Sequence, residues 1–121
     1  MNHFVPPGIH VLLDFHDAVN LEDMNGIEQI LRAAAAACGA SVLQTMLHYF
    51  GTGCGVTGVA LLAESHLSIH TWPERNYAAL DIFLCGSKSA EPAVAVLTEY
   101  FQPSRITRQD LARGTNTVIS P

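Results

Sequence analysis

Four strand-like runs follow one another between two helical segments, and this order limits the folds that the chain can adopt. Apolar residues recur at helical spacing from Asn20 to about Cys38 and again from Ala90 to Phe101. The other apolar or alternating runs predict strands over residues 9–16, 41–50, 56–63, 67–72, 77–84 and 104–111. Consecutive strands with few helices are typical of α+β folds. We therefore expect a two-layer sandwich in which a mostly antiparallel sheet carries two helices on one face.

Small polar residues and glycines mark the ends of these elements. Asn20 suits a helix N-cap, because its side chain can accept a hydrogen bond from a free N–H group of the first turn. Gly39 can end the same helix, since the residue after the last turn often takes the left-handed conformation. Gly51, Gly53 and Gly55 predict a glycine-rich loop after the second strand.

The chain of 121 residues is rich in apolar residues and poor in charge, which excludes several classes of protein. Its 49% hydrophobic and 14% charged residues oppose the composition of disordered chains, and the length fits a single domain over residues 1–121. With 6 Lys+Arg against 11 Asp+Glu, the chain has no basic stripe for binding nucleic acid. Charged residues are too few to cover so small a domain, so we expect apolar surface to pack against another subunit.

Cysteine spacing and hydropathy indicate where the protein works. Cys38, Cys54 and Cys85 are odd in number and lack a CxxC pair, which argues against a disulfide framework and a structural zinc site. Residues 1–9 lack the basic start and the long apolar core of a signal peptide. The chain also lacks a run of about 18 apolar residues, the length that could span a membrane. We therefore expect a cytoplasmic protein with no membrane partner.

The densest group of polar side chains lies in the string Glu64–Glu74, which reads ESHLSIHTWPE. Alternation along a strand places every second residue on one face, here His66, Ser68, His70 and Trp72. In the next strand the residues that share a face are Tyr77, Ala79, Asp81, Phe83 and Cys85. We expect the two neighbouring strands to bring His70 and Cys85 toward one another.

Three interpretations of this string are open from the residues alone. His66 and His70 with Glu64 or Glu74 resemble metal ligands, but histidines four residues apart on a strand are about 13 Å apart. A cysteine and a histidine could instead form a nucleophilic pair, although the signature of such a hydrolase is missing. The third interpretation is that these are ordinary strand residues, which is the usual situation of a lone histidine or buried cysteine.

The whole string, together with the YAALDIFLCG that follows it, resembles the processing and active-site segment of the prokaryotic S-adenosylmethionine decarboxylases. These are small pyruvoyl-dependent enzymes made as proenzymes. The resemblance is specific from Gly55 to Gly86 and weaker upstream, where it includes His10 and His48–Phe50. The only lysine, Lys88, lies in a polar turn and not in a pocket that could hold pyridoxal phosphate. A carbonyl made from the chain itself therefore suits the chemistry better.

The resemblance implies that the proenzyme cuts its own chain. Ser65 would attack the carbonyl of Glu64, and β-elimination of the resulting ester would leave dehydroalanine, which reacts with water and loses ammonia to become a pyruvoyl group. The products would be a β chain of residues 1–64 and an α chain of residues 65–121 that begins with pyruvoyl. This carbonyl would take up the substrate amine as a Schiff base and act as the electron sink for decarboxylation, with no metal and no pyridoxal phosphate.

The resemblance also implies roles for single side chains. His70 would move protons during self-processing, and Cys85 would protonate the carbanion that remains after CO₂ leaves. Glu74 would hold the ribose hydroxyls of the substrate, and Phe50 would offer an aromatic face to adenine or to the sulfonium. Two weaker candidates from the first strand are His10 and Asp14.

For the whole protein, the resemblance implies S-adenosylmethionine as the substrate, polyamine (spermidine) biosynthesis as the pathway and a homodimer of αβ protomers with sites near the interface. The segments that border the substrate pocket depart from the family pattern at Arg75-Asn76, Leu84 and Gly51–Gly55. A pyruvoyl-dependent arginine or ornithine decarboxylase, acting on a basic amino acid, is therefore the main alternative. A non-catalytic regulatory partner is a further alternative, against which the intact Ser65 argues.

Overall fold

The computed structural model describes residues 7–114 and 119–120 and follows the predicted order of strands and helices. The elements are β1 (Gly8–His16), α1 (Met24–Ala37), β2 (Val42–Tyr49), β3 (Val56–Leu62), β4 (Ser65–Trp72), the short 3₁₀ helix η1 (Pro73–Arg75), β5 (Tyr77–Cys85), α2 (Glu91–Phe101) and β6 (Arg105–Arg113). Every predicted strand and helix is present within a few residues of its expected position.

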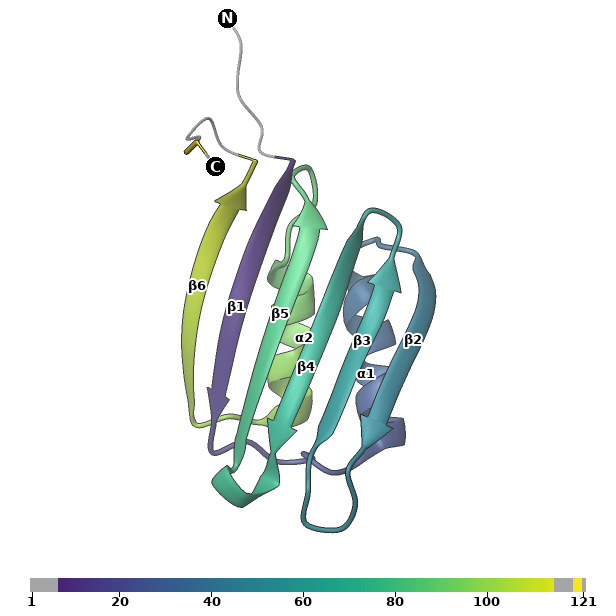
Figure 1. Ribbon diagram of the computed structural model, residues 1–121, viewed down its shortest axis with the longest axis vertical. Helices are drawn as coiled ribbons and strands as arrows, with labels where there is room; N and C mark the ends of the chain where they lie inside the picture. Colours follow the sequence, from purple (N-terminus) through teal and green to yellow (C-terminus); the bar gives the residue numbers. More distant parts are fainter. Residues whose placement is uncertain (1–6, 115–118, 121) are drawn as a thin grey trace, which may run out of the picture.

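The strands form one open sheet whose order is β2-β3-β4-β5-β1-β6. Each pair of neighbours is antiparallel, and β1 is inserted between β5 and β6. Both helices lie behind the sheet in Figure 1, so they cover one of its faces and leave the other open. The predicted α+β sandwich of two layers, with both helices on one face, is confirmed.

Alternation along the strands decides which residues face the helices. In β4 the buried residues are Leu67, Ile69 and Thr71, and the residues between them are half-buried or exposed. The same period of two continues in β5, where the buried residues are Ala78, Leu80, Ile82 and Leu84. The helices complete this core with Ile27, Leu31, Ala34, Ala35, Ala93, Leu97 and Phe101. Burial of this apolar face holds the two layers together, and it leaves the polar side chains on the open face.

The start of α1 differs from the prediction. The helix begins at Met24, and its N-cap is Asp23, whose carboxylate accepts a hydrogen bond from the Gly26 N–H at 3.0 Å. Asn20 instead takes a left-handed conformation with φ 62°, and its Nδ2 donates to the Tyr100 carbonyl oxygen at 2.8 Å. The prediction of Asn20 as N-cap is therefore wrong, because its side chain is hydrogen-bonded to α2 instead. The other end is as predicted, with Gly39 at φ 74° just after the helix.

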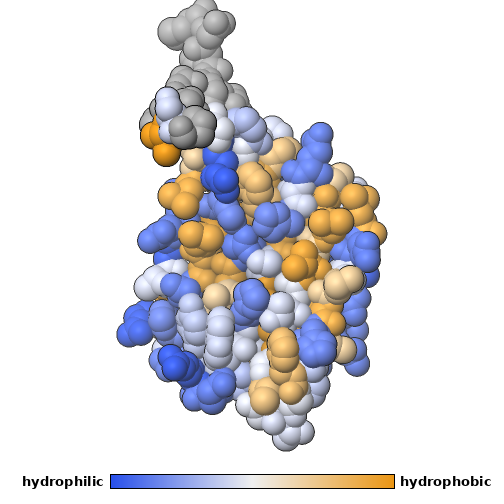
Figure 2. All heavy atoms as spheres, viewed as in Figure 1, coloured by the Kyte–Doolittle hydropathy of each residue, from blue (hydrophilic) through white to orange (hydrophobic). Residues whose placement is uncertain are grey.

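The open face of the sheet carries both apolar and polar side chains. Figure 2, which views this face, shows hydrophobic residues gathered over its upper part with hydrophilic residues among them. Met46, Val59 and Leu61 from β2 and β3 are 70%, 37% and 49% exposed. Such a surface is typical of a face that packs against another subunit, as the low charge of the chain predicts.

Among the described residues, neither helix is long and apolar enough to cross a membrane. The segment from which we predicted the lack of a signal peptide lies largely outside the described residues.

Candidate active site

Glu64 and Ser65 lie at a tight turn between β3 and β4. Glu64 has φ 65°, in the left-handed region, where a residue other than glycine is strained by about 1–2 kcal/mol. Ser65 is the first residue of β4 and is half-buried, and its Oγ donates to the Ala63 carbonyl oxygen at 3.3 Å. The hydroxyl is thus folded back over the turn that contains the peptide bond between Glu64 and Ser65. A hydroxyl held in this way can act as a local nucleophile.

Cys85 lies at the same end of the sheet as Ser65. The register between β4 and β5 pairs His66 with Phe83, so Ser65 and Cys85 stand at the ends of neighbouring strands. Neighbouring strands are about 4.8 Å apart. The Cys85 thiol is half-buried, and its Sγ lies 3.6 Å from the Ser87 Oγ.

His70 lies at the far end of β4 from these two residues. It is paired with Ala79, and five residues of extended strand separate it from Ser65, which corresponds to about 17 Å. Cys85 is six residues beyond Ala79, or about 20 Å along β5. The prediction that the two strands bring His70 and Cys85 together is therefore wrong within one chain. The reason is that the late residues of β4 pair with the early residues of β5 in an antiparallel hairpin.

His70 belongs to a second group of predicted site residues, at the opposite end of the sheet. Together with Glu74 and Phe50 it lines a hollow of ≈ 240 Å³. Its Nδ1 lies 3.0 Å from the Thr57 Oγ1, and its ring is tilted by 34° to that of Trp72, with the centroids 6.0 Å apart. Phe50 is 58% exposed, so its ring is available to a ligand. His70 thus lies together with Glu74 and Phe50, the two residues expected to bind substrate, but apart from Ser65.

Asp81 organises a cluster of polar side chains in the middle of the open face. Its Oδ2 accepts from the Nε2 of His10 at 2.5 Å and from the Nε2 of His66 at 3.1 Å. Its Oδ1 accepts from the hydroxyl of Ser68. His10, His66 and Asp81 each offer one atom that could bind a metal ion, a ring nitrogen or a carboxylate oxygen. These three atoms lie within 4.8 Å of one another.

Hydrogen bonding accounts for this cluster better than metal binding does. A neutral histidine that binds a metal through Nε2 carries its proton on Nδ1. In His10, however, Nδ1 lies 3.4 Å from a guanidinium nitrogen of Arg113, which can only donate. This contact favours the tautomer in which Nε2–H donates to Asp81. His66 and His70 also point to different partners, so the spacing that resembled a metal site does not bring them together.

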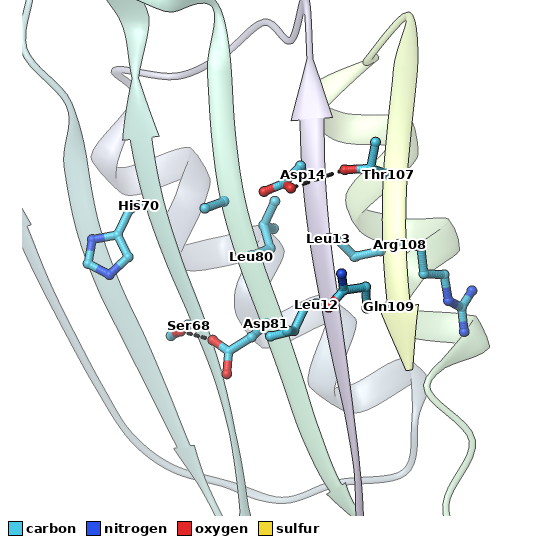
Figure 3. A pocket seen from close by; sticks show the side chains of 11 residues that line it. Leu12, Leu13, Asp14, Ser68, His70, Leu80, Asp81, Thr107, Arg108 and Gln109 are labelled. Carbon is cyan, nitrogen blue, oxygen red and sulfur yellow. Dashed lines mark hydrogen bonds between the residues drawn. The ribbon is translucent and has the colours of Figure 1, made fainter. Parts of the chain in front are cut away.

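A hollow of ≈ 490 Å³ lies beside this cluster on the open face (Figure 3). Asp14 lines it and accepts hydrogen bonds from the hydroxyl of Tyr77 and from the Thr107 Oγ1, the latter at 3.0 Å. Burial, followed by the hydrogen bond and the charge of Asp14, raises the pKa of Tyr77 to about 12. Figure 3 also shows Ser68 and Asp81 joined at the lower edge of the hollow, with His70 to one side.

Some of these residues were missed by the sequence analysis. Thr57 and Cys54 both line the hollow that contains His70 and Glu74. Thr57 lies on the open face because of strand alternation, but its contact with His70 depends on the register of β3 against β4. Asp81 was placed on the correct face, and its partnership with His10 depends on the insertion of β1 beside β5. Strand alternation could therefore have indicated Thr57 and Asp81, whereas Cys54 lies in the loop between β2 and β3, where no such signal exists.

Three comparisons connect the chain with known proteins. The family model for S-adenosylmethionine decarboxylase matches residues 9–114. An S-adenosylmethionine decarboxylase proenzyme of Methanococcus maripaludis strain C7 is 43% identical over 110 residues, covering 88% of this chain and 89% of that protein. The proenzyme of Thermomicrobium roseum is 40% identical over 108 residues, covering 88% and 93%. The crystal structure of the adenosylmethionine decarboxylase from Aquifex aeolicus has a TM-score of 0.83 at 29% identity, covering 98% of this chain and 99% of that one.

Proposed function

The chain belongs to the S-adenosylmethionine decarboxylase family, and on this premise we propose that it decarboxylates S-adenosylmethionine with a pyruvoyl group made from Ser65. The match of the family model across residues 9–114 carries the assignment of the activity. The decarboxylated product donates aminopropyl groups in polyamine biosynthesis, the pathway that makes spermidine. The family is one of proenzymes, so self-processing belongs to the proposal.

The turn at Glu64 supports processing between Glu64 and Ser65. The strained conformation of Glu64 and the position of the Ser65 hydroxyl fit the family's conversion of a serine into a pyruvoyl group. When formed, this group supplies the electron sink that decarboxylation of an amino acid requires. Cleavage would divide the single domain into a β chain of residues 1–64 and an α chain of residues 65–121, which share one core.

Other side chains of the chain have roles that suit their places in the sheet. Cys85 ends β5 next to the start of β4, where a thiol can protonate a carbanion formed near Ser65. At the opposite end, His70 is hydrogen-bonded to Thr57, which orients its ring for proton transfer. Glu74 and Phe50 line the same hollow as His70, which suits binding of ribose hydroxyls and of adenine or the sulfonium.

A homodimer of αβ protomers would reconcile the two separated groups of site residues. Within one chain, Ser65 and His70 are about 17 Å apart along β4, too far for direct proton transfer. The open face exposes Met46, Val59 and Leu61, which favours packing against a second copy. Two such copies could place His70 of one near Ser65 of the other.

A cytoplasmic location also stays a prediction.

Mass spectrometry tests the processing step. The purified protein should consist of two fragments divided between Glu64 and Ser65. The amino terminus of the α chain, residues 65–121, should be blocked by pyruvoyl. Ser65→Ala should leave one uncut chain, because the attacking hydroxyl is gone. An uncut chain in the native protein would contradict self-processing.

Release of CO₂ tests the substrate. The processed protein should release CO₂ from S-adenosylmethionine but not from ornithine or arginine. Activity toward only one of the two amino acids would identify the alternative decarboxylase, and processing without any activity would favour a regulatory partner.

Co-expression of two variants tests the shared site. Ser65→Ala supplies His70 but cannot be cut, and His70→Ala supplies Ser65 but lacks the proton-transferring side chain. If the site combines both chains, co-expression should restore cleavage of the His70→Ala chain. If each chain holds a complete site, the His70→Ala chain should remain uncut in the mixture.

A further inference from the structure

The loop between β2 and β3, residues 50–55, forms one wall of the hollow that contains His70 and Glu74. Phe50 and Cys54 of this loop line the hollow, whose volume is only ≈ 240 Å³. A small shift of the loop therefore changes a large part of the surface that a ligand would contact.

The loop has few interactions of its own that keep it in place. Gly51 and Gly53 have φ 108° and 77°, a region that glycine reaches freely but at a cost in conformational entropy when the loop is ordered. Inside the loop, the Phe50 N–H donates to the Gly55 carbonyl oxygen at 3.0 Å, and the Cys54 N–H donates to that of Gly51 at 2.8 Å. These two bonds close the loop but do not fasten it to another element.

Glu22 fastens the loop from outside. It lies between β1 and α1, and its Oε1 accepts from the Gly53 N–H at 2.7 Å and from the Tyr49 hydroxyl at 3.2 Å. Hydrogen bonds to an ionised carboxylate are stronger than those between neutral groups. A tyrosine hydroxyl is protonated at neutral pH, and burial followed by the hydrogen bond to Glu22 raises the pKa of Tyr49 further, so the hydroxyl donates to Glu22. One carboxylate thus holds both the end of β2 and the tip of the loop.

We propose that Glu22 is a positioning residue, which holds Gly53 so that the loop keeps the shape that binds S-adenosylmethionine. The inference rests on the proposed function, because it assigns the hollow beside the loop to that substrate. Without this hydrogen bond the loop spends part of its time in shapes that do not bind, and the apparent affinity falls in proportion. Glu22 does not line the hollow, so its loss acts on binding and not on the chemical step.

Steady-state kinetics of three variants test this role. Glu22→Ala should raise KM about fivefold and leave kcat within a factor of about two, since the charge-assisted hydrogen bond that holds Gly53 is lost together with the one from Tyr49. Glu22→Gln keeps an oxygen that can accept from Gly53, so it should recover most of the native KM. Glu28→Ala is the matched control, because Glu28 on α1 binds Arg32 and Thr45, away from the loop. Its KM should be that of the native protein.

Alkylation of Cys54 measures the loop without reference to activity. Cys54 is exposed, and peptide mapping by mass spectrometry separates it from Cys38 and Cys85. Glu22→Ala should alkylate Cys54 several times faster than the native protein, with Glu22→Gln between the two and Glu28→Ala unchanged. Self-cleavage should be complete in all of these variants.

Two results would overturn the inference. An unchanged rate of Cys54 alkylation in Glu22→Ala would show that the carboxylate does not hold the loop. A parallel loss of kcat and of self-cleavage would show that Glu22 supports the fold as a whole and not the loop. If the native protein released no CO₂ from S-adenosylmethionine, the proposed function would fail, while the alkylation rates would still decide whether Glu22 holds the loop.

Discussion

Replacing Glu64 by glycine should slow self-cleavage, because it removes the backbone strain at the peptide bond that is cut. Glu64 has φ 65°, which an L-residue adopts at a cost of about 1–2 kcal/mol. Glycine adopts the same conformation without that cost. The strain is useful only if attack of the Ser65 hydroxyl on the Glu64 carbonyl relieves it, since only a difference between ground state and transition state changes a rate.

The size of the effect follows from two opposing contributions. Removing the left-handed penalty stabilises the uncut chain by about 1–2 kcal/mol. The greater freedom of glycine in the unfolded chain takes back about 0.4–1 kcal/mol of this. The net gain is about 1 kcal/mol, which corresponds to a rise in Tm of about 3–5 °C for a chain of this length. The freedom of the unfolded chain does not affect cleavage, which starts from the folded precursor. If cleavage relieves all of the strain, losing about 1–2 kcal/mol slows it by about 5- to 30-fold.

Two measurements test the two parts of this prediction. Precursor made by cell-free synthesis can be sampled over time, and the cut fraction measured by mass spectrometry. The same substitutions at position 64 can also be combined with Ser65→Ala, which prevents cleavage. Thermal unfolding of these uncut double variants then measures the stability of the precursor. Glu64→Ala is the matched control, because it removes the carboxylate but keeps a Cβ at the strained position. It should be cut at nearly the native rate.

The prediction fails on either of two results. Equal cleavage rates for Glu64→Gly and Glu64→Ala would show that strain at Glu64 does not contribute to processing. A Ser65→Ala chain that is less stable with glycine than with alanine at position 64 would show that the left-handed conformation is not the one adopted before cleavage.

Three further predictions concern other parts of the molecule. Cys85→Ala should still be cut but release CO₂ much more slowly, whereas full activity would remove the thiol from the reaction. Thr71→Val, in the uncut Ser65→Ala background, should lower the free energy of unfolding in urea by about 1–3 kcal/mol. The reason is that the buried Thr71 Oγ1 accepts from the Val56 N–H at 2.8 Å and donates to the Leu21 carbonyl at 2.7 Å; an unchanged midpoint would contradict it. Tyr77, whose pKa is raised to about 12, should stay neutral at pH 11, as phenolate absorbance would show. The stability linked to its protonation should be complete below pH 10, the ordinary tyrosine value, and be lost as the pH rises toward 12.

Much of the fold could be predicted because its signals are local. A period of two in β4 and β5 and a helical period in α1 and α2 each depend on residues that are close in sequence. The same local pattern placed His66, Ser68 and His70 on one face of β4, which the burial of Leu67, Ile69 and Thr71 confirms. The start of α1 was predicted wrongly because the side chain of Asn20 is hydrogen-bonded to α2, which lies far along the chain.

The sequence supplied candidates for the site but not their arrangement in space. Glu64, Ser65, His70, Glu74 and Cys85 lie in one continuous segment whose string is specific enough to indicate the family. The string does not show that the antiparallel hairpin of β4 and β5 separates His70 from Cys85. Phe50 reaches the hollow that contains Glu74 only because the loop after β2 folds against the end of β4.

The sequence by itself determined the order of elements and the face of each strand, since both depend on neighbouring residues, and it indicated the family through one continuous string. Only the tertiary structure decided that β1 lies between β5 and β6, which brings His10 to Asp81. It also decided that Glu22 holds the loop at Gly53. Such contacts join residues distant in sequence, and they depend on strand register and on packing of the whole core, which no local period records.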